Sequence, residues 1–261
     1  MAKIHKLANR TKERQTFLEM VRAEHDCRIL LIEGESGMGK STLLRSFRQE
    51  CQMLESVSYV AFDCKGLESL PAFLYQFLED LGKENFPRFT KRIRQMDVGG
   101  VEFTGNDISG QNQISIALNP GVDAKGQEYR QEQLIEDFVE DLLAMSRRVV
   151  IIVDTFQEAH EPFQQWIGGR WLKTVARKLT NVVMVVAGHH VPDRNNLAWG
   201  DDCEYFSLNG IRDHQEWCVY AQHVGLGHFA EETIRALAIC FQGKPSEVSQ
   251  ALHLVNEEWS A

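Results

Sequence analysis

Five short apolar runs along the chain have the length and composition of buried β-strands. They are residues 27–33, 57–63, 149–154, 181–188 and 204–208. The third run, Val149-Val150-Ile151-Ile152-Val153-Asp154, has five consecutive β-branched residues, which is typical of a strand buried on both faces of a parallel sheet. We therefore predict an α/β fold in which helices flank a parallel sheet.

Between and after these runs, apolar residues recur at the three- and four-residue spacing of amphipathic helices. Phe17, Met20 and Val21 would form the buried face of a helix before the first strand. Further helices are expected at residues 42–48, 70–81 (behind an N-cap at Ser69, with Pro71 in the first turn), 134–143 and 171–179. Beyond residue 208 the chain predicts three short helices, at 213–224, 229–241 and 245–258. We therefore expect an α/β domain over residues 1–208 and a small C-terminal helical subdomain over 209–261.

Residues 95–127 interrupt this pattern. Gly, Asn and Asp dominate there, and alternating runs at 101–103 and 113–118 predict a hairpin. We expect a mobile insertion without an assigned role. A basic cluster that is typical of a solvated helix face precedes it, at Arg88, Lys91, Arg92 and Arg94.

The stretch after the first predicted strand has the spacing G-x-x-x-x-G-K-[ST] of a phosphate-binding loop. It reads Gly34-Glu35-Ser36-Gly37-Met38-Gly39-Lys40-Ser41, and Thr42 follows it in the next predicted helix. Glycines let successive backbone N–H groups point inward at anionic oxygens, and the helix adds its positive N-terminal end. Lys40 would contact the outer phosphates, and the Ser41 hydroxyl would bind Mg²⁺. The spacing predicts a P-loop NTPase that binds a nucleotide; a structural glycine-rich turn is the alternative.

Asp154 ends the strand at 149–154, at the edge where open α/β sheets bind ligands. It is the natural second residue of the magnesium site, holding the ion through water beside Ser41. In the alternative interpretation, Asp154 only caps the following turn.

Composition and charge indicate which class of protein contains this site and in which compartment it works. Hydrophobic content of 43% and charged content of 25% are typical of a soluble globular protein, and no apolar run suits a membrane span or a signal peptide. The six cysteines lack a C-x-x-C pair, which indicates a reducing compartment where cysteine serves as a small buried residue. The net charge of −9 disfavours broad nucleic-acid binding. We expect a cytoplasmic protein without a membrane partner.

Four motifs, in this order, resemble those of the signal-transduction NTPases with numerous domains (the STAND class), in the AAA-like (ASCE) division of P-loop NTPases. They are Asn9-Arg10-x-x-Glu13, the Walker A loop at 34–41, the Walker B strand at 149–154, and Gly243-Lys244-Pro245. The resemblance implies that Asn9 and Arg10 lie near the adenine and that Pro245 meets the nucleotide in a closed form. It further implies ATP or ADP with Mg²⁺ as cofactors, and a signalling or defence switch that self-associates or engages a protein effector or sensor. Relatives usually continue into a winged helix and a repeat-rich sensor, whereas this chain stops at Ala261.

Two positions depart from the family pattern. Active members often place an acid directly after the Walker B aspartate, but here the nearest carboxylate is Glu158, which either faces the phosphates or is surface charge. Where relatives often carry Gly-Arg, this chain has Gly188-His189, and a histidine is a weaker phosphate sensor because its charge depends on pH. Arg170 and Arg194 are spare candidates for that role. Lys40, Asp154 and Glu158 are thus the candidate catalytic residues of a possible, slow ATPase.

The sequence is also compatible with other functions. A degenerate NTPase scaffold would keep the fold for protein interaction without turnover. A small-molecule kinase would use Arg88, Arg92 and Arg94 as lid residues, but kinases lack the Asn-Arg entry and the Gly-x-Pro helices. A DNA-associated AAA ATPase is disfavoured by the acidic charge. His214, Cys218, His223 and His228 do not converge as zinc ligands without a specific turn, so packed or exposed side chains are favoured.

Overall fold

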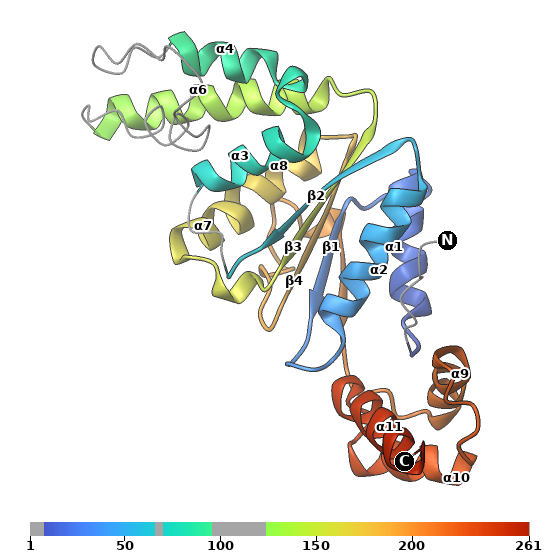
Figure 1. Ribbon diagram of the computed structural model, residues 1–261. Helices are drawn as coiled ribbons and strands as arrows, with labels where there is room; N and C mark the ends of the chain where they lie inside the picture. Colours follow the sequence, from blue (N-terminus) through green and yellow to red (C-terminus); the bar gives the residue numbers. More distant parts are fainter. Residues whose placement is uncertain (1–7, 66–69, 96–123, 261) are drawn as a thin grey trace.

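The computed structural model describes residues 8–65, 70–95 and 124–260, and its centre is a five-stranded parallel sheet (Figure 1). The strands are β1 (Ile29–Glu33), β2 (Val57–Asp63), β3 (Arg148–Asp154), β4 (Val182–Gly188) and β5 (Cys203–Ser207). Their order is β2-β3-β4-β1-β5, so β4 lies between the strand before the loop and the strand that ends in Asp154. The predicted α/β fold of a P-loop NTPase is confirmed.

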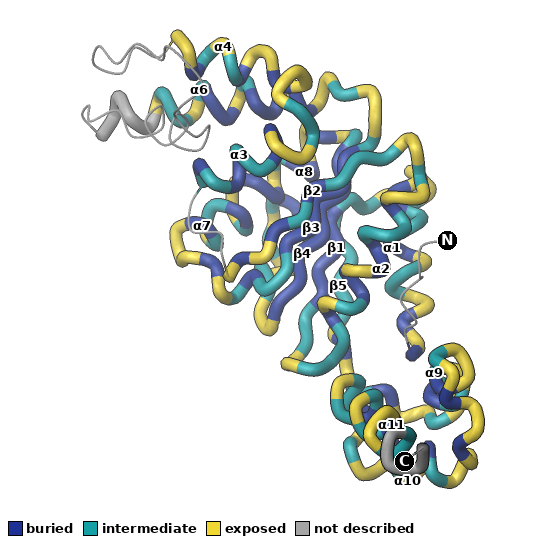
Figure 2. Tube along the Cα trace, in the orientation of Figure 1, coloured by how far each residue is buried: buried dark blue, intermediate teal, exposed yellow. Residues whose placement is uncertain are grey.

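Both faces of the sheet are buried because successive side chains of its central strands enter two different cores. Val149, Ile151 and Val153 of β3 pack into the larger core, while Val150 and Ile152 pack into the smaller one. In Figure 2 the central strands are accordingly dark along most of their length. The β-branched run therefore has the position that its composition predicts.

Helices form a layer on each side of the sheet (Figure 1). The helices α1 (Thr11–Arg22) and α2 (Lys40–Met53) cover the face with the smaller core, where the Phe17 and Phe47 rings stack 4.0 Å apart. The other face carries the helices α3 (Leu70–Leu81), α4 (Pro87–Gln95), α6 (Ala124–Leu143), α7 (Glu161–Trp166) and α8 (Leu172–Arg177). Three 3₁₀ turns, at Lys83–Asn85, Phe156–Glu158 and Gly200–Asp202, and a π-helical turn at Ile167–Trp171 complete the elements of this part.

Three further helices lie beyond the end of the sheet at which the strands terminate (Figure 1). They are α9 (His214–Val224), α10 (Glu231–Cys240) and α11 (Pro245–Ser260). They have their own hydrophobic core, built around Trp217, Ile234 and Val248, and Ala8 from the start of the described chain joins it. Gly243 ends the turn before α11 with a φ of +70°, and a Cβ there would meet the Ile211 backbone at 2.1 Å, so only glycine fits.

Some expectations need revision or lie outside the described residues. The predicted hairpin at 101–118 and the N-cap at Ser69 lie outside them. The helix expected at 134–143 already begins at Ala124, well before the first position of its predicted apolar face. Cys51 and Cys64 are buried as expected, but Cys240 is exposed on α10. Among the described residues, no helix has the length and apolarity that a bilayer crossing requires.

Candidate functional site

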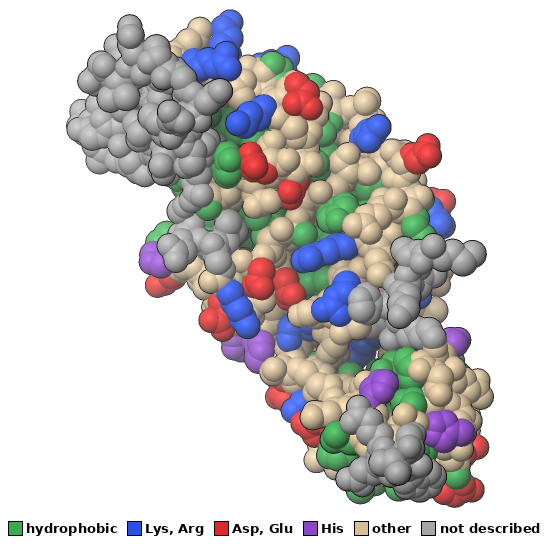
Figure 3. Space-filling model, in the orientation of Figure 1, with side chains coloured by type: hydrophobic (Ala, Val, Ile, Leu, Met, Phe, Trp, Pro, Cys, Tyr) green, Lys and Arg blue, Asp and Glu red, His purple; other side chains and the backbone are tan. Residues whose placement is uncertain are grey.

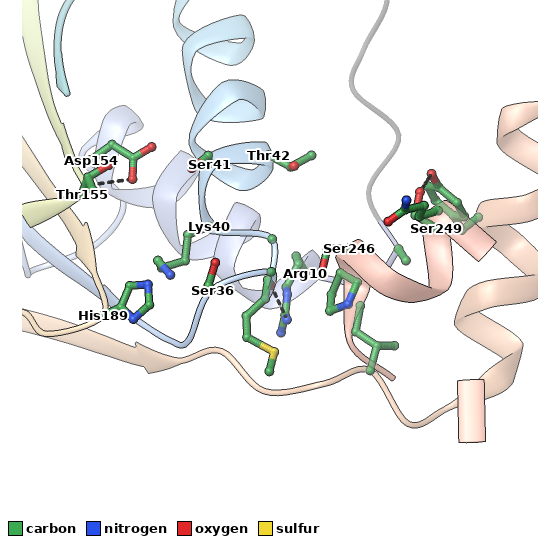
Figure 4. Close-up of a pocket in the computed structure, with 18 of the residues that line it drawn as sticks. Arg10, Ser36, Lys40, Ser41, Thr42, Asp154, Thr155, His189, Ser246 and Ser249 are labelled. Atoms are coloured by element: carbon green, nitrogen blue, oxygen red, sulfur yellow. Dashed lines mark hydrogen bonds between the residues drawn. The ribbon is translucent and has the colours of Figure 1, made fainter. Parts of the chain in front are cut away.

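A cavity of about 590 Å³ opens at the carboxyl ends of β2, β3 and β4, between the sheet and the helices α9–α11 (Figure 4). Its volume is in the range that is typical of small-molecule sites. The lining residues come from the loop, the strand ends, the entry to α1 and the C-terminal helices. They are Ala8, Arg10, Ser36–Thr42, Lys65, Asp154, Thr155, Gln157, Glu158, His189, Ile211, Trp217, Tyr220, Pro245, Ser246, Ser249 and Gln250.

The glycine-rich loop has the backbone that phosphate binding requires. Gly37 and Gly39 adopt φ values of +82° and +89°, and α2 begins at Lys40 directly behind them. The Lys40 ammonium donates hydrogen bonds to the Gly34 and Glu35 carbonyl oxygens, at 2.6 and 3.0 Å. Burial lowers the pKa of Lys40, and the nearby Asp154 carboxylate opposes this shift. Gly34 and Glu35 do not line the cavity themselves; they hold the lysine through their carbonyl groups.

The acidic side of the cavity is formed where β3 ends. The Asp154 carboxylate accepts the Thr155 N–H at 2.8 Å, and its backbone oxygen accepts the Cys64 N–H at 3.1 Å. Thr155 has a left-handed φ of +58°, so the chain does not become helical directly after Asp154. A single 3₁₀ turn follows, and Glu158 at its end is exposed but still lines the cavity. Both features that the sequence left open for Glu158, exposure and access to the cavity, therefore occur together.

Ser41 and Asp154 line the same cavity, and their side chains carry oxygen atoms, the ligands that Mg²⁺ prefers. Ser41 is exposed at the first turn of α2. Among the described residues, the Thr155 N–H bonds to one of the two Asp154 carboxylate oxygens, and no hydrogen bond to the other is seen. Figure 4 shows both side chains on the same side of the cavity as Lys40. The residues present therefore fit a magnesium ion beside bound phosphates.

Gln157 connects the ends of β3 and β4. Its side-chain oxygen accepts the His189 N–H at 2.8 Å, and it lines the cavity together with His189. A Cβ at Gly188 would approach the His190 carbonyl to 2.5 Å and the Gln157 amide to 2.8 Å, so this tight junction requires glycine. Gln157 was not singled out from the sequence, because no local pattern indicates a contact between two strands.

Arg10 joins the loop to the C-terminal helices. Its guanidinium donates to the Met38 carbonyl at 3.1 Å and to the Asn209 carbonyl at 2.8 Å, and it lies 3.5 Å from the Glu13 carboxylate. Burial lowers the pKa of Arg10, an effect that Glu13 opposes. Asn9 was expected beside the nucleotide with Arg10, but it does not line the cavity; its side chain accepts the Arg10 N–H at 2.6 Å. Asn9 thereby supports the left-handed turn that directs Arg10 inward.

The N-terminus of α11 touches the loop directly. The Ser246 N–H donates to the Gly37 carbonyl at 3.1 Å, and Pro245 lies against Gly39. A Cβ at Gly37 would meet the Ser246 hydroxyl at 2.3 Å and displace that side chain, and the φ of +82° is what favours glycine here. Figure 4 shows Ser246 and Ser249 across the loop from Asp154 and His189.

On the side of the C-terminal helices, apolar and aromatic residues line the cavity together with Ser246, Ser249 and Gln250, and of these lining residues only Pro245 was predicted. Trp217 and Ile211 belong to the core of α9–α11, and the Trp217 N–H donates to the Ile211 carbonyl at 2.8 Å. The Tyr220 and Ser249 hydroxyls are 2.7 Å apart. Lys65 is also a lining residue that the motifs did not indicate, since it belongs to none of them.

Several other candidates lie elsewhere. Neither Arg170 nor Arg194 lines the cavity. The Arg170 side chain forms an ion pair with Glu132, and the Arg194 guanidinium stacks over the Tyr205 ring. Arg88 and Arg92 of α4 form ion pairs with acids of α6. His214 contacts Glu231, and the described residues contain no group of three or more potential metal ligands. On the face drawn in Figure 3, basic and acidic side chains are interspersed.

Comparisons with known proteins agree with this geometry. Residues 22–192 match the family model of the AAA domain. A search of curated protein sequences finds no match. Three solved structures have a similar fold, all at low sequence identity.

The first is a Signal Transduction ATPase with Numerous Domains (STAND) protein with a tetratricopeptide repeat sensor from Pyrococcus horikoshii, with 17% identity and a TM-score of 0.53 over 91% of this chain. Cdc6p from Pyrobaculum aerophilum has 11% identity and a TM-score of 0.56 over 98% of this chain. A Walker-type ATPase from Pyrococcus abyssi has 13% identity and a TM-score of 0.51 over 97%. The chain spans 28% of the STAND protein, 62% of Cdc6p and 73% of the Walker-type ATPase.

Proposed function

This chain belongs to the AAA domain family, and on that premise we propose that it is an ATP- and ADP-binding switch that controls self-association or a protein partner in signalling or defence. The observation that carries the proposal is the hydrogen bond from the Ser246 N–H to the Gly37 carbonyl, at 3.1 Å. It connects the helix that contains Pro245 to the phosphate-binding loop. A nucleotide in this cavity would contact both parts at once.

The switch would work through the relative position of two units, residues 1–208 and 209–261. A ligand shifts a conformational equilibrium only when it binds the two conformations with different affinity. Lys40 and Asp154 line the part of the cavity that belongs to the α/β domain, and Trp217 and Pro245 line the part that belongs to residues 209–261. Because the second wall moves with residues 209–261, ATP and ADP can favour different positions of those helices.

Ser41 and Asp154 would hold Mg²⁺, and the ion would offset negative charge on the phosphate oxygens. The loop N–H groups would bind the phosphates, and Lys40 would move from the Gly34 and Glu35 carbonyls to a phosphate oxygen. Glu158 would orient a water molecule, and its exposure at the end of a 3₁₀ turn suits slow rather than fast hydrolysis. Arg10 and Pro245 would contribute to the side that holds the remainder of the nucleotide; Asn9 would support Arg10.

The test measures nucleotide affinity in the purified full chain by isothermal titration. We expect a Kd in the micromolar range or below, about −8 kcal/mol. Lys40→Ala should weaken binding by at least about a hundredfold, because it removes the only side-chain cation of the loop. Lys173→Ala is the matched control, since Lys173 is exposed on α8 and does not line the cavity. Equal affinity in wild type and Lys40→Ala would refute nucleotide binding at this loop.

The second candidate, a scaffold without turnover, is favoured by the absence of an acid directly after Asp154. It predicts no thermal shift with either nucleotide and no phosphate release. The switch predicts that bound ADP slows hydrogen exchange in α11 relative to the nucleotide-free protein. Phosphate release that Glu158→Gln abolishes, with ATP binding retained, would assign Glu158 to the hydrolytic step.

A further inference from the structure

Lys65 lies just beyond the end of β2, and the backbone holds it at the acidic side of the cavity. Residue Asp63 pairs with Asp154 across β2 and β3, and the Cys64 N–H donates to the Asp154 carbonyl at 3.1 Å. The Asp63 carboxylate then accepts the Lys65 N–H at 3.1 Å, which fixes the turn after the strand. Lys65 lines the same cavity as Asp154 and Glu158.

Three cationic side chains other than histidine line the cavity, and two of them are already engaged. Lys40 donates to the Gly34 and Glu35 carbonyls. Arg10 is committed to the Met38 and Asn209 carbonyls. Within residues 8–65, 70–95 and 124–260, the Lys65 ammonium has no hydrogen bond or ion pair.

Lys65 and His189 line the same cavity from the two strands that flank β3, and the end of β4 carries a histidine rather than an arginine or lysine. That strand ends in Gly188-His189, and the backbone N–H of His189 donates to the side-chain oxygen of Gln157. An imidazole ring has at most two N–H donors, whereas a lysine ammonium has three on a flexible stem. ATP carries one more negative charge and one more phosphoryl group than ADP, so a mobile, fully charged side chain at this side favours the triphosphate.

We propose that Lys65 binds the γ-phosphate of ATP and is the residue by which this site distinguishes ATP from ADP. The inference rests on the proposed nucleotide switch and adds to it a residue that none of its motifs contains. Lys65 supplies from β2 the positive charge that an arginine after β4 would otherwise supply. The flexible stem of lysine allows the ammonium to reach the phosphate without any movement of the strand.

The test compares the affinities for ADP and for a non-hydrolysable ATP analogue, both with Mg²⁺, by isothermal titration of the full chain. Lys65→Ala should weaken binding of the ATP analogue by roughly ten- to a hundredfold, the range of one charge-assisted hydrogen bond, and change ADP binding by less than about threefold. Lys65→Arg should retain most of the preference because it keeps the charge. Lys173→Ala, again the matched control, should bind both nucleotides like wild type.

Titration of the wild type tests nucleotide binding, and titration of Lys65→Ala tests the role of Lys65. If wild type binds neither nucleotide, the nucleotide switch fails and the inference fails with it. If wild type binds both, and Lys65→Ala weakens both equally or neither, the switch stands and the role of Lys65 is refuted. Lys65 is exposed, so an unchanged melting temperature of the variant is expected and would show that any loss of affinity is local.

Discussion

Replacing Arg10 with alanine tests how the C-terminal helices are attached to the loop. Arg10 is 9% exposed, and a single guanidinium nitrogen donates to both the Met38 carbonyl in the loop and the Asn209 carbonyl before α9. Glu13 lies 3.5 Å from the other nitrogen. The variant should therefore loosen the contact between α9–α11 and the sheet without affecting the sheet itself.

The expected loss of stabilising free energy in Arg10→Ala can be estimated from these contacts. A hydrogen bond to a charged group contributes about 1.5–3 kcal/mol to stability. Asn209 is exposed and Met38 half-buried, so water would replace part of both bonds in the variant. Removing the guanidinium also relieves the cost of its burial, the same cost that lowers its pKa. A net loss of about 2 kcal/mol remains, which corresponds to a roughly 30-fold larger opening constant.

Native-state hydrogen exchange measures this opening helix by helix. Amides in α9–α11 of Arg10→Ala should exchange about 30-fold faster, and those of β1 and β3 should be unchanged. Arg10→Gly loses the same contacts but relieves the left-handed φ of +78°, so it should be about 1 kcal/mol less destabilised than Arg10→Ala. Arg22→Ala, an exposed arginine at the end of α1, is the control. Exchange in α9–α11 within twofold of wild type would refute the reasoning.

Two further predictions concern the sheet domain. Asp141 is 2% exposed and accepts the Phe89 N–H at 2.9 Å in the first turn of α4. Asp141→Ala should therefore lower the free energy of unfolding, measured in urea titrations, by about 1–3 kcal/mol. The control Glu136→Ala, at an exposed position of α6, should change it by less than about 0.5 kcal/mol. Burial raises the pKa of the Cys51 thiol from 9.0 to about 12, so the unfolded chain releases this proton at lower pH than the folded protein. Stability should therefore fall as pH rises from 9 towards 12, and the fall should be smaller in Cys51→Ala; parallel curves for the two proteins would contradict this explanation.

The sequence alone determined the fold class and the centre of the site, because both depend on local pattern. Five β-branched residues before Asp154 require burial on both faces, whatever packs against them. The glycines at 37 and 39 are needed for positive φ, and Lys40 and Ser41 follow in the first turn of α2. The break at Gly243 likewise follows from its own backbone, whose φ of +70° favours glycine.

The tertiary structure decided what surrounds this centre, because those contacts join residues that are far apart in the chain. The placement of β4 between β1 and β3 brings His189 and Gln157 together, and no periodicity contains that order. The left-handed turn at Thr155 directs Glu158, whereas a helical continuation was equally compatible with the sequence. Lys65 belongs to no motif, and only the pairing of β2 with β3 places it in the cavity. Local spacing specifies an element and its buried face; the neighbours of that element depend on long-range packing, which spacing does not encode.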